Sequence, residues 1–160
     1  MKIRVSVKVL SIVFLLVLSL GPGISVYAES PMKVEFTVPE EDGLKVGKET
    51  LVKGTANVPG GNYLWVLVHR TKGFKRVWWP QNEAEIDPIK KTWDVNVVFG
   101  GPQDIGYEFE IAAIVVKEPE HLKLQAYRDK AMSSGHWPPI PMPQTVTAPK
   151  IRTVKKVNHN

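Results

Sequence analysis

The chain has 160 residues, contains no cysteine and carries a formal net charge of +5. The lack of cysteine excludes disulfides, thiol chemistry and a cysteine site for lipid attachment. Three of the positive charges fall in residues 1–28, so residues 29–160 hold 18 Lys and Arg against 16 Asp and Glu, a net charge of +2. No basic stripe of the kind that binds phosphate backbones crosses this part of the chain, so nucleic acid is not an expected partner.

A signal peptide is predicted at residues 1–28. Three basic residues precede an apolar run at 9–20, glycine and proline interrupt the chain at 21–23, and residues 26–28 resemble a small-residue cleavage site. The alternative is an uncleaved membrane anchor, but the run is shorter than the ~20 residues that a spanning helix needs. We therefore expect export to the periplasm or the extracellular space, with no membrane attachment after cleavage.

The first part of the mature chain predicts three strands. Apolar and polar residues alternate at 33–38, before Pro39, and again at 51–58, as in half-buried strands. Turn residues follow at 59–62. Residues 63–70 are apolar on both faces, which predicts a central strand whose second face needs a cover.

The next segment, residues 75–91, predicts only short strands and turns. Residues 75–80 have the composition of a brief strand, and Pro80 is expected to end it because proline cannot donate to a sheet. The polar residues that follow are expected to form turns, with a possible edge strand around 83–86.

The clearest alternation lies in residues 92–116. Residues 92–99 and 107–116 each place their apolar side chains in one row, and the loop between them, 100–106, contains three glycines and a proline. A loop of this length and composition suits a hairpin. We therefore expect the two strands to lie side by side and antiparallel, with both rows in one core.

After residue 116 the spacing of apolar residues changes from the strand period to the helical period. Residues 119–132 repeat at the helical period, which predicts a helix of about three turns that covers the second face of the strand at 63–70. Residues 136–144 include four prolines and predict an extended loop. A last strand is expected at 151–157.

These elements predict one domain over residues 29–160, because about 130 residues suffice for a single core. Seven or so short strands at regular spacing predict an all-β fold, an immunoglobulin-like antiparallel β-sandwich with one appended C-terminal helix. A small barrel is the alternative.

A set of core and turn residues supports the same fold. It consists of Val52-x-Gly54, Leu64-Trp65-Val66-x-Val68, Trp79-Pro80-Gln81, Trp93, Gly100 to Gly106 and Phe109-Glu110-Ile111. Together these residues resemble a small immunoglobulin-like domain that recurs in exported bacterial proteins. The resemblance covers about half of the mature chain and implies a sandwich, with Trp65 as its core tryptophan. It implies no catalytic residues.

Few residues suggest catalysis or the binding of a metal or a phosphate. Glu108 and Glu110 lie two apart on one expected strand and so share a face, as paired carboxylates do in general acid and base catalysis, although a solvated strand face is the simpler explanation. The four histidines are scattered and lack metal-ligand spacing, and the loop at 100–106 lacks the Lys and Ser or Thr of a phosphate-binding loop. No metal and no cofactor is expected.

The aromatic residues are the candidate ligand-binding residues. Trp78 and Trp79 are successive on a strand, so their rings point to opposite faces, and only one of them can join a given core. An outward tryptophan can stack on a sugar ring or fill a pocket of a partner protein. Trp137, in the proline-rich loop, is the third candidate, although that loop can equally cover the outward ring.

The leading interpretation is a non-enzymatic exported binding or interaction module whose partner is a protein or carbohydrate of the cell envelope. The alternatives are a small polysaccharide hydrolase or lyase that uses Glu108 and Glu110, and a structural accessory subunit of an envelope complex. An aromatic surface flanked by polar groups favours carbohydrate, a flat apolar patch favours a protein partner, and a cleft with converging carboxylates favours an enzyme.

Overall fold

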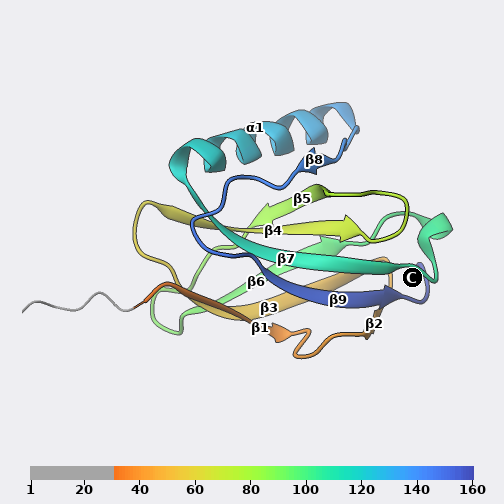
Figure 1. The fold of residues 1–160 in the computed structure, drawn as a ribbon, viewed down its shortest axis with the longest axis horizontal. Helices are drawn as coiled ribbons and strands as arrows, with labels where there is room; N and C mark the ends of the chain where they lie inside the picture. Colours follow the sequence, from red (N-terminus) through yellow and green to blue (C-terminus); the bar gives the residue numbers. More distant parts are fainter. Residues whose placement is uncertain (1–30) are drawn as a thin grey trace, which may run out of the picture.

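The computed structural model describes residues 31–160, so the predicted signal peptide lies outside the described residues. Two sheets pack face to face and α1 lies over the outer face of the larger sheet (Figure 1). The smaller sheet has the order β1-β3-β6, with β1 at Lys33–Val38, β3 at Glu49–Asn57 and β6 at Thr92–Val98.

The larger sheet has six strands in the order β2-β9-β7-β4-β5-β8. Their bounds are Leu44–Val46 for β2, Asn62–Arg70 for β4, Val77–Glu83 for β5, Glu108–Lys117 for β7, Ile140–Pro141 for β8 and Lys150–Lys156 for β9. The predicted all-β sandwich with one C-terminal helix is confirmed. The described residues form nine strands where about seven were expected, and β2 pairs with β9 in parallel while the other pairs are antiparallel.

The sandwich interior is built from the alternating rows that the sequence predicts. The row of β6 begins at Trp93 and continues to Phe99, and it faces the row of β7 that contains Phe109 and Ile111. Ile111 and Phe99 are completely buried, and the rings of Phe99 and Phe109 meet edge to face at 5.6 Å. Burial of such rows is the main stabilising contribution to a fold that has no disulfide.

The predicted hairpin at residues 92–116 is wrong. β6 pairs with β3 and β7 pairs with β4 and β9, so the two strands belong to different sheets. Two apolar rows share a core equally well when they face each other across a sandwich, about 10 Å apart. The loop between them contains the short 3₁₀ helix η1, Pro102–Asp104, and is long enough to cross between the sheets.

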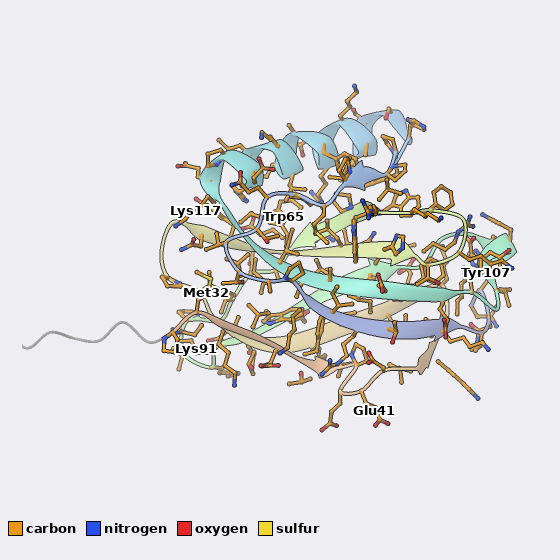
Figure 2. All side chains as sticks on the ribbon, in the orientation of Figure 1. Met32, Glu41, Trp65, Lys91, Tyr107 and Lys117 are labelled. Atoms are coloured by element: carbon orange, nitrogen blue, oxygen red, sulfur yellow. The ribbon has the colours of Figure 1, made fainter. Side chains whose placement is uncertain are left out.

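The helix α1, Glu118–Ser134, covers the outer face of β4 as expected. Leu124 of α1 packs with Trp65 and Leu67 in a second buried cluster, separate from the sandwich interior. Figure 2 shows Trp65 on this side of the sheet, toward α1. The expectation that Trp65 is the sandwich-core tryptophan is therefore wrong, since alternation along β4 turns its ring toward the helix. Neither helix of residues 31–160 is long and apolar enough to span a membrane.

Pro80 does not end its strand, contrary to expectation. β5 continues to Glu83, and the register with β4 shifts after Pro80, so that Gln81 is an extra residue in the ladder. On its other side β5 pairs with β8 only at Val77 and Trp78. β5 is therefore an edge strand at Pro80, where the missing N–H donor is tolerated.

Candidate ligand-binding groove

A groove of about 710 Å³ opens between the edge strands β5 and β6 of the two sheets. The C-terminal half of α1 and the loop after it form one side, the outer edge of the small sheet forms the other, and the β6–β7 connection closes one end. Val98 of β6 donates its backbone N–H to the Gln81 side-chain oxygen at 2.9 Å, which ties the two sheets together at the groove. We call this feature the edge groove. Its volume suits a small molecule or a short oligomer.

Trp79 is the central aromatic residue of the edge groove. It lies opposite Val68 in the ladder and so projects from the inner side of the large sheet, at the point where the small sheet no longer covers it. Its ring is half-buried and meets Phe74 edge to face at 5.0 Å. Its Nε1 donates a hydrogen bond of 3.0 Å to the carbonyl oxygen of Trp137.

Trp137 lines the same groove from the proline-rich loop and keeps 41% of its surface exposed. Two ring donors fix this loop: the Nε1 of Trp79 and the hydroxyl of Tyr127, which bonds to the Pro138 carbonyl at 2.9 Å. A proline-rich segment has little conformational freedom to lose and few N–H groups of its own, so two anchors hold it in place. The loop and α1 therefore complete the binding surface as well as covering the sheet.

Side-chain amides surround the aromatic rings. Asn82, Asn96 and Gln103 line the edge groove together with Gln81. Asn96 donates to Glu49 at 2.9 Å and Asn82 accepts from Arg128 at 2.6 Å. Each of these two amides uses one polar atom in the protein contact, and no protein partner among residues 31–160 is found for the other. The free atoms are a carbonyl acceptor and an NH₂ donor, the pair of groups that hydroxyl-rich ligands satisfy.

The closed end of the groove is held by a network of charges. Arg70 forms an ion pair with Asp104, which is only 4% exposed. The other oxygen of Asp104 accepts the Gly101 N–H at 2.9 Å. Lys156 is completely buried and donates to the carbonyls of the same connection, at 2.6 Å for Gly101. Each charge of this end therefore has partners within the protein.

Trp78 does not belong to the groove. Its exposed fraction is 6%, and it packs with Leu67 in the cluster beneath α1, with the ring of His69 at 5.2 Å. Trp78 and Trp79 point to opposite faces of β5, as predicted, and the covered ring of Trp78 does not line the edge groove. Of the three candidate tryptophans, the structure brings together Trp79 and Trp137.

Glu108 and Glu110 also lie away from the groove. Both are on β7, where Phe109 between them faces the interior and lines the edge groove, so the two carboxylates take the other face of the sheet. Within residues 31–160 no group of three or more His, Cys, Asp or Glu side chains is arranged to hold a metal ion.

Sequence reasoning missed most of the residues that line the edge groove, among them Phe74, Asn82 and Arg128. The available signal for Gln81 and Asn82 is that these polar residues follow Trp79 and Pro80 directly in the sequence. Arg128 and Met132 stand four apart on α1 and line the groove together, a pairing that the helical period predicts only once the helix's position is known.

Comparisons with known proteins give no relatives for this chain: no protein-family model matches it, and no curated protein shows significant similarity.

Proposed function

We propose that this protein is an exported, non-enzymatic binding module that holds an oligosaccharide of the cell envelope in the edge groove. The observation that carries the proposal is the convergence of Trp79 and Trp137 with side-chain amides in one preformed groove. Sugars present apolar C–H faces and hydroxyl edges, and aromatic rings flanked by amides match both. A flat apolar patch, which favours a protein partner, does not describe this mixed surface.

The absence of a catalytic role is part of the same proposal. The carboxylates that line the edge groove are Glu49 and Asp104, and each is occupied. Asp104 is paired with Arg70 and accepts the Gly101 N–H, while Glu49 accepts from Asn96. Glycoside hydrolysis needs an acid and a base that face the bond to be cleaved, and these two carboxylates are held in other contacts.

We assign the fold to the immunoglobulin-like class within this proposal. The small sheet has the order β1-β3-β6 and the large sheet contains β9-β7-β4-β5. These orders correspond to strands A-B-E and G-F-C-C′ of such sandwiches, in the same chain order. α1 and the loop after it are additions to that scaffold, and they supply one side of the edge groove.

The test is a glycan array followed by calorimetric titration with the mature protein and two variants. Trp79→Ala should weaken binding about twofold to twelvefold, because a stacked ring contributes roughly 0.5–1.5 kcal/mol. Ile89→Ala removes an apolar side chain that is 89% exposed and outside the groove, and it should leave affinity unchanged. Thermal unfolding of each variant separates a loss of binding from a loss of folding.

Trp78→Ala completes the set. It should lower the free energy of unfolding by about 3 to 5 kcal/mol, because its ring is buried under α1. If no oligosaccharide binds the folded wild type, or if Trp79→Ala and Ile89→Ala bind equally well, the edge groove is not a sugar site. Binding by an envelope protein on the same face would favour the alternative of an accessory subunit.

A further inference from the structure

Four charged residues line the edge groove: Glu49, Arg70, Asp104 and Arg128. Arg70 and Asp104 neutralise each other in an ion pair. Glu49 lies 3.7 Å from the ammonium group of Lys48 and also accepts a hydrogen bond from Asn96. Arg128 is the remaining charge, and no carboxylate of residues 31–160 pairs with it.

The guanidinium of Arg128 is held in a defined orientation. Its Nε donates to the Oδ1 of Asn82 at 2.6 Å, and the residue is half-buried where α1 packs against β5. This hydrogen bond holds the guanidinium plane at its Nε edge. The two Nη nitrogens have no acceptor among the described residues, so their donors remain available in the groove.

A half-buried cation without a counter-charge is costly unless something compensates it. No compensating carboxylate lies within ion-pair distance among residues 31–160, and the planar fork of arginine donors matches a carboxylate in bidentate geometry. Met132, one turn further along α1, and Trp137 lie on the same side of the groove. The acceptor is therefore expected on a ligand that also contacts apolar and aromatic surface.

We propose that the edge groove selects an oligosaccharide that carries a carboxylate, and that Arg128 is the residue that recognises this carboxylate. The proposal rests on the proposed function, since it names the class of sugar bound at that site. Two kinds of sugar carry such a carboxylate: a uronic acid, with the carboxylate on the ring, and an N-acetylmuramic acid, with the carboxylate on an ether-linked lactyl group. Both combine a sugar ring that can stack on an aromatic side chain with an anionic group.

The experiment compares matched charged and neutral probes by calorimetric titration of the mature protein. The first pair is a trigalacturonate and its methyl ester, and the second is a tetrasaccharide of N-acetylglucosamine and N-acetylmuramic acid against one of N-acetylglucosamine alone. The charged member of at least one pair should bind about tenfold or more tightly than its neutral partner. That preference should weaken as salt rises from low to high concentration.

Three variants assign the preference to its residue. Arg128→Gln should remove the difference between charged and neutral probes while the affinity for the neutral probe stays about the same. Arg128→Lys keeps the charge without the planar fork, so it should retain only part of the preference. Lys130→Gln removes one positive charge from an exposed position of the same helix and should change neither affinity.

Each result has a distinct meaning. Equal binding of charged and neutral probes, or a preference that survives Arg128→Gln, overturns the inference and leaves the sugar-binding function in place. Binding of none of the four probes by a wild type that binds other glycans also overturns it. If no glycan binds, the proposed function fails as well. If Arg128→Gln does not fold, Arg128→Lys still tests whether the preference depends on the planar fork of donors.

Discussion

Lys156 shows how a single residue shapes the closed end of the edge groove. Its ammonium group is completely buried and donates to three successive carbonyls, those of Phe99, Gly100 and Gly101, at 2.6, 3.2 and 2.6 Å. Burial lowers the pKa of the Lys156 ammonium below its ordinary value of 10.5, and the negative charge of Asp104 opposes that shift. The three bonds fix the start of the β6–β7 connection, the segment that carries Asp104.

The first prediction replaces this lysine by an apolar residue of similar length. Lys156→Met should lower the free energy of unfolding by about 2 to 5 kcal/mol, because three carbonyls lose their buried donor. Lys155→Met, at the exposed neighbouring position, should change it by less than about 0.5 kcal/mol. Urea unfolding of both variants measures the difference. Equal losses would show that the buried bonds contribute nothing specific.

The helix α1 is held by a narrow contact with the large sheet. Leu124 is 2% exposed and packs against Trp65, while His121 accepts a hydrogen bond of 3.1 Å from the Nε1 of the same tryptophan. His121 also stacks on Tyr63, with the ring centres 3.7 Å apart. These few side chains position the helix, and the helix in turn positions Arg128 and the loop that carries Trp137.

The second prediction compares two leucines of this helix. Leu124→Ala should cost about 2 to 5 kcal/mol in unfolding free energy, because it removes buried apolar surface and leaves a cavity. Leu122→Ala makes the same chemical change at a position that is 54% exposed, and it should cost less than about 1 kcal/mol. Thermal unfolding checks both. Similar losses at the two positions would mean that the helix packs through another face.

The sequence predicts which residues of these strands are buried, but it does not predict which strands pair. The apolar rows at Trp93 and at Ile111, and the apolar second face of β4, were correctly predicted because alternation depends on local geometry. The pairing of β6 was predicted wrongly, because the burial of an apolar row does not specify which strand pairs with that strand. The edge groove was missed for the same reason: Trp79 is far along the chain from Arg128 and Trp137, and only the packing of α1 brings them together.

At the scale of the whole molecule, two carboxylates tie the N-terminal segment to β9. A hydrogen bond from the Thr153 N–H, at 2.8 Å, lowers the pKa of Asp42 below 3.8. The bond from Lys150, at 2.9 Å, lowers the pKa of Glu35 below 4.5, and the charges of Lys150 and Lys33 act in the same direction. Both contacts join parts of the chain that are more than a hundred residues apart.

The third prediction follows from the sign of these shifts. A carboxylate whose pKa is lower in the folded state than in the unfolded state stabilises the fold above its unfolded value, and this stabilisation is lost as pH falls through the folded value. The unfolding temperature should therefore decrease as pH falls below about 4.5. Asp42→Asn should make this decrease shallower. Glu41→Gln, an adjacent and exposed change of equal charge, should leave it as in the wild type, and identical profiles for the two variants would exclude the proposed tie.

The five tryptophans test in one measurement whether the edge groove is the binding site. Their indole N–H signals are followed by two-dimensional NMR while ¹⁵N-labelled protein of residues 29–160 is titrated with the tetrasaccharide of N-acetylglucosamine and N-acetylmuramic acid, or with the best glycan from the array. The signals of Trp79 and Trp137 should shift progressively to saturation, while those of the buried Trp65, Trp78 and Trp93 stay in place. If the ligand binds and the Trp79 and Trp137 signals do not move, the ligand binds outside the edge groove.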